Sequence, residues 1–179
     1  MVARRSLQGD NCPNARSLDV IGDWWSLLIV RDAFDGLTRF GEFQKSLGIA
    51  KNILSDRLRT LVVRGILELA PATDGGVRQE YRLTPMGRDL FPVMVALRQW
   101  GERHLFAEGE PHSSLIERET GLPVRLEIHA QDGRPIGPDD TVVLKVPDQG
   151  QTRPAPAAAI ERGVQIDLPP RIGGPQPKR

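Results

Sequence analysis

The side chains best suited to chemistry gather in one basic segment, residues 39–64. This segment holds six Lys or Arg residues against two Asp or Glu residues. Near its middle stand Lys51, Asn52, Ser55 and Arg59. Asn can bind the edge of adenine with two hydrogen bonds, Arg and Lys can bind the edge of guanine, and Ser can reach a base or a phosphate. The segment therefore carries the residue types that read a nucleic-acid duplex.

Three further arginines extend this basic surface. Arg39 at the start of the segment and Arg78 beyond it are predicted to contact phosphates, which fixes register without reading sequence. Arg57 lies nearer the packed side of its predicted helix, and an internal ion pair and a contact with DNA are equally good interpretations of it. Taken singly, such polar side chains are most often solvated surface residues. Their joint placement is what favours a binding surface.

Two predicted helices and a hairpin must position these side chains. Residues 39–47 and residues 50–64 each carry apolar residues at helical spacing, and Gly48-Ile49 makes a tight turn between them. Strand-like stretches follow at residues 66–70 and 77–83, separated by a flexible Asp-Gly-Gly tip. This order of parts is that of a winged helix-turn-helix, in which the second helix enters the major groove and the hairpin lies along the DNA backbone.

Framework helices are predicted on both sides of this unit. One runs from Pro13 to Gly22, and a largely apolar one is capped by Asp23 and stops at Asp35-Gly36. A third opens at Thr84-Pro85, and Pro92 should kink or divide it. This last helix, to about residue 106, is apolar on more sides than one small core can cover. We therefore expect a homodimer.

Beyond residue 107 the chain differs in its composition and in its pattern of apolar residues. Residues 108–146 alternate apolar and polar side chains and predict a small β-rich appendage of unknown role, whereas residues 147–179 are rich in Pro and Gly and predict a disordered tail. The expected fold class is α+β: a mostly helical winged helix-turn-helix domain over residues 12–107 with a two-stranded β wing, then the appendage and the tail.

Composition excludes several other classes of protein. The chain has 179 residues, of which 39% are hydrophobic and 26% charged, with one Cys and three His. A single cysteine permits no internal disulfide and the histidines show no ligand spacing, so we expect no structural metal and no cofactor. No apolar run approaches a membrane span, which predicts a cytoplasmic protein without a membrane partner. We find no phosphate loop, metal cluster or nucleophile elbow, so we do not expect an enzyme.

A set of short motifs resembles one family of bacterial regulators. These are Cys12-Pro13, Ile21-Gly22-Asp23-Trp24-Trp25, Leu27-Leu28-Ile29, Arg39-Phe40, Leu54-Ser55-Asp56-Arg57-Leu58, Tyr81-Arg82-Leu83-Thr84, Gly87, and Leu97 to Trp100. In this order and spacing they resemble the HxlR-type family. The resemblance covers about residues 12–107 and implies a homodimeric winged helix that binds inverted-repeat operators in double-stranded DNA, usually as a repressor. Many members have Gly-Lys where this chain has Asp23-Trp24, a change that removes a basic side chain there.

Cys12 has two interpretations. In some relatives a cysteine at this place senses electrophiles or oxidants, and a position before a helix start can raise thiol reactivity. Alternatively it is a small buried hydrophobe near a dimer interface. The sequence also leaves open a winged helix that serves ligand binding or protein–protein contact, with a small-molecule effector held by residues 108–146.

Overall fold

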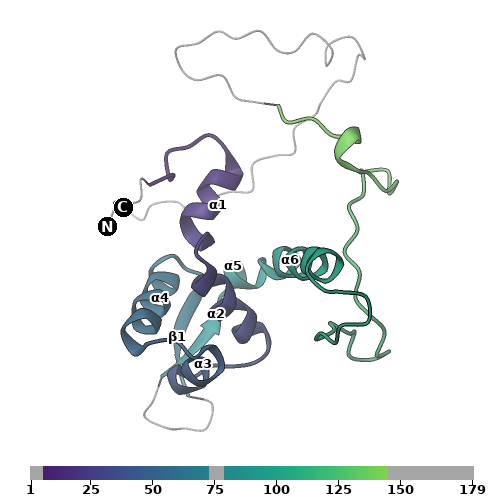
Figure 1. The fold of residues 1–179 in the computed structure, drawn as a ribbon. Helices are drawn as coiled ribbons and strands as arrows, with labels where there is room; N and C mark the ends of the chain where they lie inside the picture. Colours follow the sequence, from purple (N-terminus) through teal and green to yellow (C-terminus); the bar gives the residue numbers. More distant parts are fainter. Residues whose placement is uncertain (1–5, 73–78, 145–179) are drawn as a thin grey trace. The chain divides into compact units, whose positions relative to one another are not determined.

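The computed structural model describes residues 6–72 and 79–144 (Figure 1). Contacts divide the chain into two units, residues 1–141 and residues 142–179, and every helix and strand below lies in the first. In chain order these elements are α1 (Pro13–Ile21), α2 (Trp24–Phe34), α3 (Phe40–Leu47), α4 (Lys51–Val63), β1 (Leu67–Pro71), β2 (Gln79–Leu83), α5 (Pro85–Arg88), α6 (Phe91–His104) and a short 3-10 helix (Pro138–Asp140). Among the described residues no helix is long and apolar enough to cross a membrane.

The first two helices begin at the residues that the sequence predicts. Pro13 occupies the first turn of α1, where its missing N–H leaves no hydrogen bond unmade. Asp23 precedes α2 and accepts a hydrogen bond of 3.1 Å from the backbone N–H of Ser26. Because α2 contacts α1, α3, α4, α6 and β2, it is the central helix. Its first residue, Trp24, is 66% exposed, and its ring lies against that of Trp25 with the ring centres 4.4 Å apart.

A tight turn joins α3 to α4, as predicted for a helix-turn-helix unit. Gly48 ends α3 with a φ of +60°, a left-handed conformation that favours glycine because it has no Cβ. Ile49 follows and is buried in the core. On α4, the side chains of Leu54, Leu58 and Leu61 are fully buried. Their burial fixes which face of α4 points outward.

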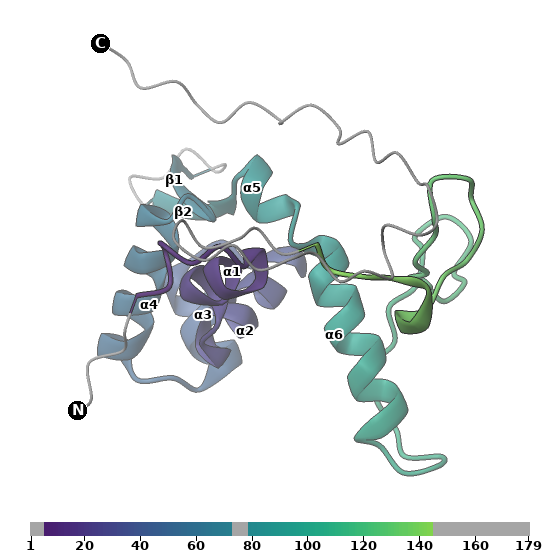
Figure 2. The ribbon, with the colours of Figure 1, turned by 90° about the horizontal axis from the view of Figure 1, so that it is seen from above.

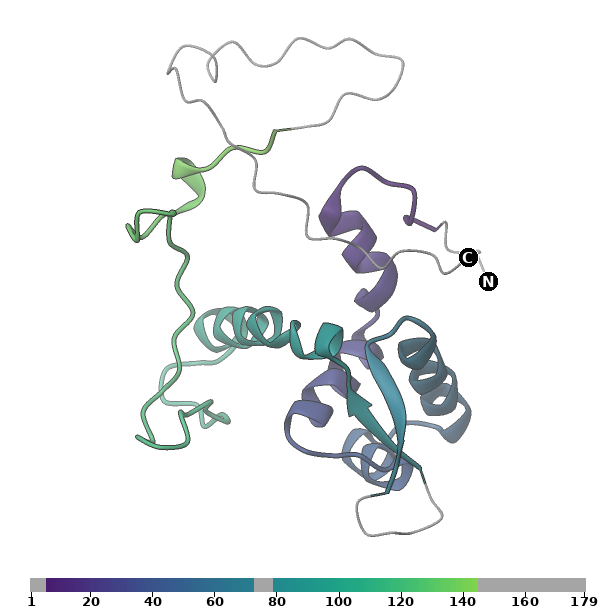
Figure 3. The same cartoon turned by 180° about the vertical axis from the view of Figure 1, so that it is seen from behind.

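The wing is an antiparallel hairpin of β1 and β2. Its register runs from Leu67 opposite Leu83 to Pro71 opposite Gln79. Figure 3 shows the two strands side by side, and β1 contacts α4 while β2 contacts α2. On the outer edge of β2, the backbone N–H of Tyr81 donates to the carbonyl of Thr38 at 2.8 Å. The loop before α3 thus covers part of an edge that would otherwise be unpaired.

Pro92 divides the last helical stretch, as the sequence predicts. The short α5 is capped by Thr84, whose hydroxyl accepts from the N–H of Gly87 at 3.0 Å and contacts the carbonyl of Gly65 at 2.5 Å. Pro92 then stands in the first turn of α6, because a proline cannot donate the hydrogen bond that would continue α5. Figure 2 shows α6 leading away from the other helices.

One hydrophobic core holds the helix-turn-helix unit, α2 and the wing together. Its buried members are Ile21, Ile29, Val30, Phe43, Ile49, Leu54, Leu58, Leu61, Ile66 and Leu67. They come from α1 through β1, so α3 and α4, which carry predicted DNA-contacting side chains, both contribute to this core. The α+β winged helix-turn-helix class is confirmed.

The appendage has less regular structure than its alternating sequence predicts. Residues 108–144 contain two isolated β-bridges, Ile116 with Pro123 and His129 with Pro135, and no strand. The side chain of Gln99 in α6 instead pairs with the extended backbone, donating to the carbonyl of Val124 at 2.9 Å and accepting from the N–H of Leu126 at 3.3 Å. Here the alternation of apolar and polar residues belongs to a segment that is extended but has no neighbouring strand with which to form a sheet. The predicted disordered tail, residues 147–179, lies outside the described residues.

Candidate nucleic-acid interface

The outward face of α4 carries the predicted base-reading residues. Lys51, Asn52, Ser55 and Arg59 are all exposed, on the side away from the buried leucines. Because successive turns of a helix bring residues three and four apart together, Asn52, Ser55 and Arg59 lie in one row. The structure therefore brings together on one helix face the four residues that the sequence singled out there.

The beginning of α4 is positively polarised. Ala50 precedes the helix and makes no side-chain capping bond, so the first backbone N–H groups of α4 have no side chain from the N-cap residue to satisfy them. Lys51 adds a full positive charge at the same end. Uncapped N–H groups and the helix dipole both favour a phosphate at such a terminus.

Asp56 contacts Arg59, the last of the predicted base-reading residues on the outward face of α4. Its carboxylate lies 2.6 Å from a terminal nitrogen of Arg59 and 3.3 Å from one of Arg57. The Arg59 side chain is nevertheless 73% exposed, so it remains accessible to a partner. Asp56 thus holds the guanidinium of Arg59 in place in the free protein, before any duplex is bound.

Arg57 forms an internal ion pair, which is one of the two interpretations that the sequence allows for it. Its Nε lies 3.2 Å from Oδ1 of Asp23, the residue that caps α2. The contact lacks the geometry of a hydrogen bond, so it is a charge contact rather than a directed one. With its side chain 34% exposed, Arg57 joins α4 to the start of α2. This geometry favours a structural role for Arg57.

Arg39 stands at the start of α3 and reaches the wing. Its guanidinium lies 3.5 Å from the carboxylate of Glu80 in β2, and its side chain is 41% exposed. Below it, Glu42 accepts hydrogen bonds from the backbone N–H groups of Thr38 and Arg39, at 2.9 and 2.8 Å. These two bonds hold the pKa of Glu42 below its usual value. The turn that presents Arg39 is thus held by an ionised cap.

Sequence reasoning missed two of the acidic partners of these arginines, Asp23 and Glu80. Asp23 was predicted as a cap, but its contact with Arg57 depends on how α2 and α4 pack. Glu80 was not singled out, because a period-two strand with one covered face predicts a solvent-facing side chain there. The structure buries it instead, at 3% exposure. Arg78, the third predicted phosphate contact, lies outside the described residues.

Cys12 precedes α1 and is exposed. Its backbone N–H donates to the carboxylate of Asp10 at 2.7 Å. This exposure is that of a single chain, so both interpretations of Cys12, a sensing thiol and a residue buried near a dimer interface, remain predictions.

The apolar surface that α6 exposes is continuous along the helix. Val93, Leu97 and Trp100 follow each other at helical spacing and are 46%, 49% and 50% exposed. Leu105 and Phe106 directly follow the C-terminal end of α6 and are also exposed. Side chains of this size on an exposed helix are typical of a protein–protein contact.

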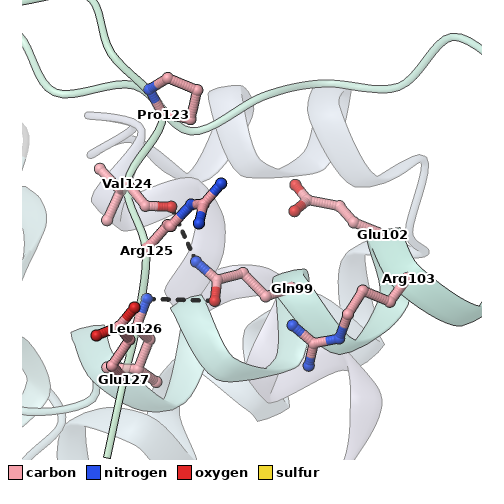
Figure 4. A pocket seen from close by; sticks show the side chains of 8 residues that line it. All are labelled: Gln99, Glu102, Arg103, Pro123, Val124, Arg125, Leu126 and Glu127. Carbon is pink, nitrogen blue, oxygen red and sulfur yellow. Dashed lines mark hydrogen bonds between the residues drawn. The ribbon is translucent and has the colours of Figure 1, made fainter.

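An open pocket of about 330 Å³ lies where residues 123–127 run along α6. Figure 4 shows the amide of Gln99 turned to the backbone of this segment, with Arg125 and Glu102 extending into the space beside it. Arg103 and Glu127 also line the pocket. The lining thus combines charged side chains of both signs with the apolar side chains of Pro123, Val124 and Leu126.

Comparisons with known proteins show which proteins this chain resembles. The family model of HxlR-like helix-turn-helix proteins matches residues 20–108. The solved structure of PA1607, a candidate transcription factor, is 60% identical, covers 77% of this chain and 97% of its own, and superposes with a TM-score of 0.74. The uncharacterized HTH-type transcriptional regulator MT3179 of Mycobacterium tuberculosis (strain CDC 1551 / Oshkosh) is 42% identical over 114 residues, which are 64% of this chain.

The matched stretch spans 65% of the length of that mycobacterial relative. The uncharacterized HTH-type transcriptional regulator YdeP of Bacillus subtilis (strain 168) is 33% identical over 53% of this chain and 75% of its own. The match of the family model begins at the end of α1 and includes the helix-turn-helix unit, the wing and α6. This chain belongs to the HxlR-like helix-turn-helix family.

Proposed function

We propose that this protein is a sequence-specific, DNA-binding transcriptional regulator that acts as a homodimeric repressor on an inverted-repeat operator. The observation that carries the proposal is the outward face of α4, where Asn52, Ser55 and Arg59 are exposed opposite three fully buried leucines. A helix held in this way by its apolar side can enter a major groove without rearranging the core. No catalytic step is part of this proposal.

Within that function, the residues divide into two roles. Asn52, Ser55 and Arg59 reach base edges from the middle of α4. Lys51, Arg39 and Arg78 contact phosphates, Lys51 from the start of α4 and Arg39 from the start of α3. Arg57 contributes to DNA binding chiefly through its charge, because its guanidinium is engaged with Asp23 and Asp56.

Dimerisation places two copies of α4 on one face of the DNA. The exposed apolar side chains of α6 supply the surface on which a second copy packs. A two-fold axis then presents two recognition helices to half-sites about one helical turn apart, as for other helix-turn-helix dimers. Occupancy of such an operator near a promoter represses transcription by excluding the polymerase.

Selection of duplexes from a random pool, followed by binding titrations, tests this function. Arg39→Ala should weaken binding to selected and random duplexes alike and reduce the salt dependence, because one phosphate contact is lost. Asn52→Ala and Arg59→Ala should reduce discrimination by about 1–3 kcal/mol at particular base pairs. Arg134→Ala removes the same charge from an exposed site in the appendage and is the matched control. If Arg39→Ala, Asn52→Ala and Arg59→Ala each lost as much affinity for random duplexes as for the selected one, the assignment of α4 as the recognition helix would be contradicted.

Ligand binding is the second candidate function, and the pocket beside Gln99 favours it. An effector seated against α6 could change how two copies pack and so alter operator affinity. Gln99→Ala and Arg125→Ala should then remove the response of DNA binding to a polar effector while leaving affinity without effector unchanged. A screen of small polar molecules by thermal shift, repeated on these two variants, identifies such a ligand or excludes this pocket as its site.

A further inference from the structure

Glu80 is a buried carboxylate in the wing. Its relative exposure is 3%, although its neighbours Gln79 and Arg82 along β2 remain open to solvent to different degrees. Tyr81 and Leu83 point to the core, so the strand period places Glu80 and Arg82 on the other face of the hairpin. A carboxylate withdrawn from water on that face requires charged or hydrogen-bonding partners.

Two arginines supply that compensation. The terminal nitrogen of Arg82 donates to Oε2 of Glu80 at 2.9 Å, and a terminal nitrogen of Arg39 lies 3.5 Å from Oε1. Arg82 belongs to the same strand, whereas Arg39 comes from the start of α3. Each oxygen of one buried carboxylate therefore faces a cation, and one of the two cations belongs to the helix-turn-helix unit.

The backbone around Arg39 is held from two other directions. Thr38 accepts the backbone N–H of Tyr81 at 2.8 Å, and Glu42 accepts the backbone N–H of Arg39 at 2.8 Å. With the backbone fixed, the freedom that remains at this position is the rotation of the long Arg39 side chain. The contact with Glu80 restricts that rotation and leaves the side chain 41% exposed.

We propose that Glu80 is a positioning residue for DNA binding, which holds the Arg39 guanidinium in the orientation that meets a phosphate. This inference rests on the proposed function, specifically on Arg39 as a phosphate contact. A guanidinium has five N–H donors, so one edge can face Glu80 while another binds a phosphate oxygen. Because Arg39 is ordered before DNA arrives, less side-chain entropy is lost on binding.

Simple electrostatics predicts the opposite effect for the same residue. A negative charge beside the duplex repels phosphates, so a carboxylate that did no more than add charge would weaken binding, and its removal would strengthen it. Positioning predicts that its removal weakens binding although the protein becomes more positive. The sign of one measurement therefore separates the two effects.

The test compares Glu80→Gln with Glu68→Gln on the duplex selected by the wild type, with salt titrations. Glu68 is an exposed carboxylate on the same hairpin, opposite Arg82 in the register, and its variant changes the charge equally. Glu80→Gln should weaken binding, by at most about eightfold at 0.1 M salt, and lower the salt slope by at most about 0.9, the limits that complete loss of one phosphate contact would set. Glu68→Gln should bind as tightly as the wild type or slightly more tightly.

The same substitutions in an Arg39→Ala background separate positioning from damage to the fold. If Glu80 acts through Arg39, Glu80→Gln should have no further effect on affinity there. Equal losses in both backgrounds, or tighter binding by Glu80→Gln, would overturn the proposal. If Arg39→Ala binds like the wild type, the phosphate contact and this inference both fail while recognition by α4 stands. Failure of the wild type to select any duplex would instead refute the proposed function itself.

Discussion

The carboxylate of Asp23 lies 3.2 Å from Nε of Arg57, so the residue that caps α2 also contacts the middle of α4. The same carboxylate accepts the backbone N–H of Ser26 and the Ser26 hydroxyl. Ser26 is itself fully buried. One acidic side chain thus caps the central helix and also makes a charge contact with α4.

Replacement of Asp23 should separate its two roles. Asp23→Ala removes the cap and the charge contact and should lower the free energy of unfolding by about 1–2 kcal/mol. Asp23→Asn keeps a side chain that caps well and loses only the contact with the partly exposed Arg57, which should cost less than about 1 kcal/mol. Urea unfolding at one fixed protein concentration measures both. Losses of equal size would show that the ion pair, and not the cap, dominates.

Gly87 should tolerate no side chain. A Cβ added there would lie 2.2 Å from the carbonyl oxygen of Ile66, a backbone atom that cannot move without shifting β1. Gly87→Ala should therefore lower the free energy of unfolding by about 1–3 kcal/mol, the usual range for overpacking. Gly101 in α6 has no atom within 4 Å of the same added Cβ. Gly101→Ala is the matched control and should raise helix stability by up to about 1 kcal/mol.

Glu42 should make stability depend on pH in the acidic range. The backbone N–H groups of Thr38 and Arg39 lower the pKa of its carboxyl in the folded protein. The ionised form is therefore favoured by folding, and its contribution is complete above the ordinary pKa of glutamate and is lost as pH falls through the lowered folded pKa. The stability difference between wild type and Glu42→Gln should shrink as pH falls through that window. A difference that stays constant over the same pH range would show that ionisation of Glu42 does not contribute.

The exposed face of α6 should carry the homodimer. Leu97→Glu places a charge in the centre of the row formed by Val93, Leu97 and Trp100, and should shift sedimentation at micromolar concentration from dimer to monomer. Val63→Glu adds the same charge at a site that is 79% exposed at the end of α4, and it should leave the dimer intact. A wild type that sediments as a monomer and still binds its operator with full affinity would refute the dimer.

Cys12 should affect DNA binding if α1 lies near the dimer axis. An adduct or an intersubunit disulfide at this exposed thiol would then shift the two recognition helices relative to each other, and half-sites about one turn apart tolerate little shift. Operator titrations of wild type and Cys12→Ser, before and after diamide or a quinone, measure the effect. A response confined to the wild type supports sensing. An equal response, or none, in both proteins would exclude Cys12 as the sensor.

Local signals in the sequence were sufficient to predict where the helices begin and end. Pro13, Asp23 and Thr84 act on the backbone groups next to them, so each helix start follows from residues only a few positions away. The turn at Gly48 and the division at Pro92 have equally local causes. The outward face of α4 also follows from sequence, because the spacing of Leu54, Leu58 and Leu61 defines the buried side.

Contacts between distant segments were decided only by the tertiary structure. The sequence could not assign Arg57 to Asp23 or bury Glu80 between Arg39 and Arg82, because those contacts depend on how α2, α3, α4 and the wing pack. It also predicted strands at residues 124–128, which are extended but have no partner strand. Alternation of apolar and polar residues shows that the two sides of a segment face different surroundings, but it does not show whether a second strand is there to pair with. Periodicity and capping are properties of neighbouring residues, whereas ion pairs and strand pairing require the positions that the whole fold provides.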